Sequence, residues 1–105
     1  MIRLKIQKEL LKIGYNPLHI GTKYLVEAIY IIYENNKSIY KINLEKEIYK
    51  KLALKYEKNM QTIKSNIVKA TNSIDIKNNP TISNSLKITP KLAIWFVMEN
   101  IKNGR

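Results

Sequence analysis

Apolar side chains recur at helical spacing along most of this chain, and that periodicity limits its fold more than any other feature. Ile2, Ile6, Leu10 and Ile13 fall on one face of a helix, and Gly14 follows as a C-terminal stop signal. Isoleucine and tyrosine would suit strands equally well, but no alternating pattern competes. The sequence therefore predicts an all-α fold, a compact bundle of five to six helices that forms a single domain over residues 1–105.

The remaining helices are placed by their apolar faces and their capping residues. They are expected at about 22–35, from Asn43 to about 56, from Met60 or Gln61 to about 74, and from Thr89 onward, with Pro90 at the first helical position. Their inward faces are predicted to be Leu25, Ala28, Ile29 and Ile32, then Leu44, Ile48, Leu52 and Tyr56, then Ile63, Ile67, Ala70 and Ile74. Trp95 and Phe96 are expected in the core, and the alternative is that one of them joins a self-association surface. Residues 75–88 are expected to be irregular, with a turn at Asn78-Asn79-Pro80.

The chain carries a net charge of +11, from 19 Lys and Arg against 8 Asp and Glu. Such an excess indicates a polyanionic partner, and nucleic acid is the usual one. AT-rich coding, which favours Lys, Ile, Asn and Tyr, is an alternative source of part of this charge. The only arginines are Arg3 and Arg105. Positive charge is therefore supplied by lysine, which suits phosphates better than the edges of guanine.

Several classes of function are disfavoured by the composition. The chain has no cysteine, and its single histidine, His19, is expected at the surface or at a helix start, so neither a disulfide nor a metal site is predicted. The sequence has no evident pair of catalytic carboxylates and no Gly-rich phosphate loop, so we expect no enzyme and no cofactor. No apolar run approaches the roughly 20 residues that cross a bilayer, and the charged N-terminus is unlike a signal peptide. A cytoplasmic protein without a membrane partner is expected.

The helices predicted on either side of a short polar stretch fit a helix-turn-helix at about 43–74. Ala53 supplies the small residue that such a motif needs where its two helices pack closely, and Ile63 and Ile67 supply the buried aliphatic side chains. Glu57 or Lys58 occupies the place where the connector often holds a glycine. Any helical hairpin would share much of this pattern, so the motif alone does not establish DNA binding.

The outward face of the helix predicted at 60–74 carries short polar groups and lysines, and no acidic residue lies between Lys58 and Ile74. Side chains of this kind contact base edges and phosphates in a major groove. We predict that bases or nearby phosphates are contacted by Gln61, Thr62, Lys64, Ser65 and Lys69, and thymine methyl groups by Val68. Phosphates are predicted to be held by Lys50, Lys51, Lys58 and Asn59. The alternative is a solvated face that is rich in Lys and Asn only because of AT-rich coding.

Several short motifs follow one another at a characteristic spacing. They are Ile13-Gly14, Gly21, Tyr24-Leu25, Glu27-Ala28-Ile29 and Tyr33, then Ile48-Tyr49, Leu52-Ala53 and Lys55-Tyr56. Their order and spacing resemble the C-terminal effector domain of the master sporulation response regulator (stage-zero sporulation protein A) of endospore-forming bacteria. The resemblance covers nearly the whole chain. It implies a compact helical domain whose helix-turn-helix binds in the major groove, often as tandem copies along the DNA.

The chain departs from that family at the residues that would determine its target sequence. The family carries an Arg-x-Glu-Arg cluster on its recognition helix, and the corresponding positions here are Thr62, Lys64 and Ser65. A further family arginine corresponds to Val68, and a family proline to Lys50. We therefore expect the scaffold to be kept and the base preference to differ. The 105 residues also leave no room for the receiver domain that normally precedes this module, so a domain acting without one is expected.

Two hypotheses for the function follow from these observations. The first is a sequence-specific protein that binds double-stranded DNA and regulates transcription, as a homodimer or as tandem copies on the DNA. The second is a protein-interaction module of the same fold, which pairs with a full-length regulator and modulates it without reading DNA. The loss of the family's base-reading residues supports the second. RNA binding rests on charge alone.

Overall fold

Helices make up all the regular secondary structure in the part of the chain that the computed structural model describes, residues 1–74 and 87–103. The elements are α1 (Ile2–Ile13), α2 (Ile20–Glu34), the π-helical segment η1 (Leu44–Tyr49), α3 (Lys50–Tyr56), α4 (Met60–Asn72) and α5 (Pro90–Lys102). The all-α prediction is confirmed. The turn predicted at Asn78-Asn79-Pro80 lies outside the described residues.

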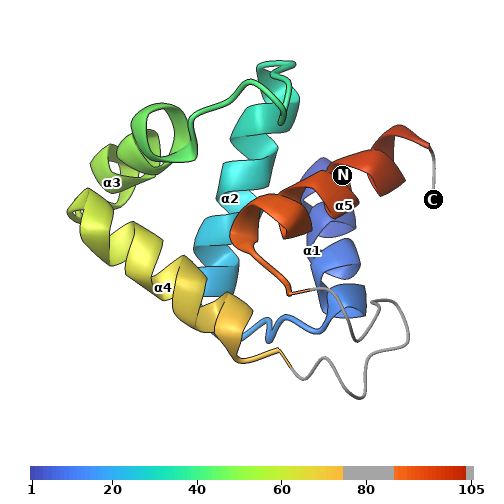
Figure 1. Ribbon diagram of the computed structural model, residues 1–105, viewed down its shortest axis with the longest axis horizontal. Helices are drawn as coiled ribbons and strands as arrows, with labels where there is room; N and C mark the ends of the chain where they lie inside the picture. Colours follow the sequence, from blue (N-terminus) through green and yellow to red (C-terminus); the bar gives the residue numbers. More distant parts are fainter. Residues whose placement is uncertain (75–86, 104–105) are drawn as a thin grey trace.

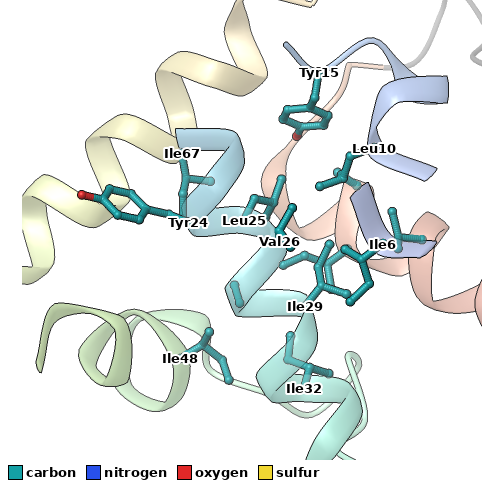
Figure 2. Packing of buried hydrophobic residues seen from close by; sticks show 14 of the residues in the cluster. Ile6, Leu10, Tyr15, Tyr24, Leu25, Val26, Ile29, Ile32, Ile48 and Ile67 are labelled. Atoms are coloured by element: carbon teal, nitrogen blue, oxygen red, sulfur yellow. The ribbon is translucent and has the colours of Figure 1, made fainter. Parts of the chain in front are cut away.

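Helix α2 forms the centre of the molecule. Figure 1 shows α3 and α4 on one side of α2 and α1 and α5 on the other, and α2 contacts every other helical element. Its apolar side chains point in several directions: Figure 2 shows Ile29 and Ile32 among side chains from the surrounding elements, including Ile6 and Ile48. One apolar core therefore joins all the helices around α2.

Local signals at the helix ends act largely as predicted. Gly14 ends α1 in the left-handed conformation, with φ of 119°, and its N–H donates to the carbonyl groups of Leu10 and Leu11. Helix α2 begins at Ile20, earlier than the predicted Thr22, because Nδ1 of His19 accepts a hydrogen bond from the backbone N–H of Gly21 at 2.9 Å. His19 is therefore an N-cap.

Two aromatic residues of α5 differ from their predicted positions. Trp95, expected in the core, is 36% exposed, and its Nε1 donates to the hydroxyl of Tyr40 at 3.0 Å. Phe96 is only partly buried against the core. Because α5 is apolar over more than half its circumference, its sequence did not show that Ala93, Ile94, Val97 and Met98 form the buried face.

Among residues 1–74 and 87–103, no helix combines the length and the apolar character that crossing a membrane requires.

Helix α2 approaches α4 so closely at Gly21 that no side chain fits between them. A Cβ atom built at Gly21 would lie 1.9 Å from the carbonyl oxygen of Asn66 and 2.9 Å from the Cβ of Ala70. The obstacle is backbone, which cannot rotate away as a flexible side chain would. A residue other than glycine at this position must therefore push α4 away from α2.

We predict that Gly21→Ala lowers the free energy of unfolding by about 1–3 kcal/mol or more, since overpacking usually costs this much. The loss is expected even though alanine has a higher helix propensity than glycine. Urea denaturation followed by circular dichroism measures the change. Lys23→Ala, at an exposed position one half-turn along the same helix, is the control and is expected to stay within about 0.5 kcal/mol of the parent. Equal unfolding midpoints for Gly21→Ala and the parent would show that the helices are not in this contact.

Candidate nucleic-acid interface

The first helix of the predicted helix-turn-helix is made of η1 and α3, which follow each other without a break. Asn43 begins it, as predicted: its Oδ1 accepts from the N–H of Lys46 at 3.0 Å, and its own backbone N–H donates to Oε2 of Glu47 at 2.7 Å. Ile48 and Leu52 are buried as predicted, whereas Leu44 and Tyr56 are only partly buried. This arrangement fixes the side of the helix that faces α2.

The connector between α3 and α4 contains the sharp turn that the motif needs. Glu57 adopts the left-handed conformation, with φ of 54°, at the place where such connectors often hold glycine. The N–H of Lys58 bonds to the carbonyl of Ala53 at 3.0 Å, and Oδ1 of Asn59 accepts from the N–H of Thr62 at 2.7 Å. Asn59, predicted as a phosphate contact, therefore also caps α4.

The rotation of α4 about its axis is set by buried contacts. Ile63, Ile67 and Ala70 are fully buried, as the sequence predicts. At its C-terminal end, the hydroxyl groups of Tyr15 and Thr71 share a hydrogen bond of 2.8 Å. Burial raises the pKa of Tyr15 to about 12, against the opposing effect of the Thr71 bond, so the phenol stays neutral. These contacts determine which side chains of α4 face away from the protein.

The residues predicted to contact bases lie on α4 and differ in how exposed their side chains are. Gln61 and Lys69 are exposed, whereas Thr62, Lys64 and Ser65 are partly buried, as is Val68. Nζ of Lys64 donates to Oε1 of Glu45 on η1, so this lysine is held within the motif. Oγ of Ser65 and the head groups of Gln61 and Lys69 can donate hydrogen bonds to base edges or phosphate oxygens.

The residues predicted to hold phosphates are also at the surface. Lys50 and Lys51 lie on α3, and Lys58 and Asn59 lie in the connector; all four are exposed. The Oδ1 of Asn59 accepts the capping bond, and its side-chain NH₂ group can donate a hydrogen bond to a ligand. The structure therefore places these donors on the same predicted helix-turn-helix as α4.

An ion-pair cluster around Glu27 was not predicted. Glu27 lies on α2 and is almost fully buried, and its carboxylate accepts from Arg3 of α1 at 2.9 and 3.2 Å and from Lys55 of α3 at 2.7 Å. Burial raises the pKa of Glu27, but the hydrogen bonds from Arg3 and Lys55 outweigh it and hold the pKa below its ordinary value. The sequence showed Glu27 only as one residue of the motif Glu27-Ala28-Ile29. Its role is to join three helices.

A comparison with protein families gives a match over most of the chain. The family described as Spo0A_C, sporulation initiation factor Spo0A C terminal, matches residues 6–90. Among curated proteins, no sequence matches the chain.

The cluster around Glu27 leads to a prediction about stability and pH. Glu27→Gln removes the charge that Arg3 and Lys55 bind, and should lower the free energy of unfolding at pH 7 by about 1.5–3 kcal/mol, the range for hydrogen bonds to charged groups. Because the pKa of Glu27 is lowered by folding, its contribution is fully present above the pKa of the unfolded chain, about 4.3, and is lost as the pH falls through the lower folded value.

Urea denaturation of the parent and the variant from pH 7 down to pH 2 measures this dependence. The difference between the two proteins should shrink as the pH falls, since both then carry an uncharged group. Glu34→Gln, the same change at an exposed position of α2, is the control, with an expected effect below about 0.5 kcal/mol. A difference that is independent of pH would contradict the ionic origin of this contribution.

Proposed function

The chain belongs to the family of the sporulation initiation factor Spo0A C-terminal domain, a family of DNA-binding effector domains, and on this premise we propose that it binds specific double-stranded DNA sites through α4 and regulates transcription. The observation that carries the proposal is the outer surface of α4. Its inner face is buried against the core, and its outer face presents hydroxyl, amide and ammonium groups without an acidic residue.

The size and the surroundings of α4 support this proposal. The helix has 13 residues, which suffice to lie along a major groove. Its N-terminus follows the connector that carries Lys58 and Asn59, so phosphates could be held next to the first turn. Within this proposal, Gln61, Thr62, Lys64, Ser65 and Lys69 contact bases or nearby phosphates, and Val68 contacts thymine methyl groups. Lys50, Lys51, Lys58 and Asn59 hold phosphates.

A binding selection from random duplex DNA at near-physiological salt provides the first test. The proposal expects an enriched sequence motif. Because α4 carries no arginine, which forms the commonest specific contact with guanine, that motif should depend less on G·C pairs than the site that the family's arginines read. A pool that stays random, with strong salt dependence of binding, would mean that the chain binds phosphates only.

Three substitutions then separate base contacts from phosphate contacts. Ser65→Ala and Lys69→Ala should weaken binding to the selected duplex by roughly 1–3 kcal/mol and leave binding to a scrambled duplex almost unchanged. Lys58→Ala should weaken binding to both duplexes and lower the slope of log K against log salt by about one unit. Matched titrations of the parent and the three variants on both duplexes measure these effects.

Equal, small losses on both duplexes for all three variants would contradict sequence reading by α4. That outcome would favour the alternative, a module of this fold that pairs with a full-length regulator, because such a module need not use α4 as its binding surface.

A further inference from the structure

The lysine in the second turn of α4 is already bound by an acidic residue of the same motif. Nζ of Lys64 donates a hydrogen bond to Oε1 of Glu45, which lies in the first turn of η1. The two side chains are 44% and 46% exposed, so the pair lies at the surface. Both residues line one surface groove between η1, α4 and the start of α5, together with Val68 and Lys91. The pair thus lies within the proposed DNA-binding surface.

This pair contributes little to the stability of the fold, because ion pairs that water can reach are weak. Its expected effect is on DNA binding and not on folding. While Lys64 is bonded to Glu45, its charge is neutralised at short range and its ammonium group is held at one position. Without Glu45, Lys64 could bind whichever phosphate lay within its reach, since phosphate contacts carry no sequence information.

The second acidic residue in the same turn is engaged elsewhere. Glu47 accepts from Lys37 at 3.2 Å and from the backbone N–H of Asn43 at 2.7 Å. Its carboxylate thus bonds to residues outside α4, and among the described residues Glu45 alone forms an ion pair with α4. The chain therefore contains two neighbouring carboxylates of which only one can act on Lys64.

We propose that Glu45 is a specificity-determining residue, which restrains Lys64 from binding phosphates indiscriminately and positions it for a contact at the selected site. This inference rests on the proposed function. Glu45 acts through Lys64 and need not contact DNA itself. When a selected duplex presents an acceptor within reach of the held ammonium group, Lys64 makes that contact with one of its three N–H donors while another stays bonded to Glu45.

The test is Glu45→Gln, measured on selected and scrambled duplexes over a range of salt concentrations. Binding to scrambled DNA should strengthen by about two- to fivefold, the range that an exposed ion pair is worth, and its salt slope should steepen by about one unit. Binding to the selected duplex should strengthen less, because the released ammonium group is no longer positioned. The ratio of the two affinities should therefore fall.

Two controls show whether the effect passes through Lys64. Glu47→Gln removes the same charge from the same turn but does not release Lys64, so it should leave the affinity ratio unchanged. In a Lys64→Ala background, Glu45→Gln should have no remaining effect on the ratio. Circular dichroism is expected to show the helix content of the parent for each variant, since all three side chains are at least one-third exposed.

Two results overturn the inference while the proposed function stands: an equal change for Glu47→Gln, or a change that persists undiminished in the Lys64→Ala background. Either would mean that Glu45 acts only as a negative charge near DNA. A parent that binds selected and scrambled duplexes equally would instead overturn the proposed function, and the specificity role of Glu45 with it.

Discussion

The backbone contact between Gly21 and Asn66 is the constraint on which the geometry of the candidate interface depends. It brings α2 and α4 closer than any side chain allows, and it lies in the first turn of the helix that organises the whole core. The Tyr15–Thr71 hydrogen bond holds the far end of α4. Two fixed points along one helix determine both its direction and its rotation, and the buried Ile63 and Ile67 then follow from that rotation. The outward face of α4 is thus set by contacts that lie behind it.

Charge is distributed so that the described acidic residues near the motif are mostly bound by the protein itself. Glu27 is held by Arg3 and Lys55, Glu45 by Lys64, and Glu47 by Lys37. Glu27 and Glu45 join helices, and Glu47 joins η1 to the segment after α2. The exposed lysines that these carboxylates do not bind include Lys50 and Lys51 of α3 and Lys58 of the connector. An excess of lysine that AT-rich coding alone produced would not require this pairing, because solvated acids would serve as well. Because the acids are paired within the protein, the exposed positive charge near the motif comes from the remaining lysines.

The sequence predicts what depends on neighbours along the chain and misses what depends on distance in space. The caps at Asn43 and Thr89, the stop at Gly14 and the apolar stripe of α4 follow from local rules that involve residues three or four apart. The bonds from Arg3 to Glu27 and from Lys64 to Glu45 join residues 24 and 19 positions apart, and no spacing rule connects them. The same limit explains Trp95, since an apolar helix does not show which of its sides meets the core. The sequence showed Gly21 as part of the family motif. It did not show that glycine is needed there because the backbone of α4 leaves no room for a side chain.

The packing also explains how the chain can belong to the family and still differ from it at the positions where the resemblance places an Arg-x-Glu-Arg cluster. The contacts that place α4 involve Gly21, Tyr15, Ile63, Ile67 and Ala70, all of which lie on or against its inner face. The resemblance places the family's reading cluster and a further arginine at Thr62, Lys64, Ser65 and Val68. These side chains take no part in the contacts that place α4. Only the backbone N–H of Thr62 does, because it donates to the capping Asn59. Changes on the outer face therefore leave the position of the helix almost unaffected. In such a scaffold, one set of residues holds α4 in place and another set would select the DNA target. The residues that select the target can therefore change while the position of α4 is kept.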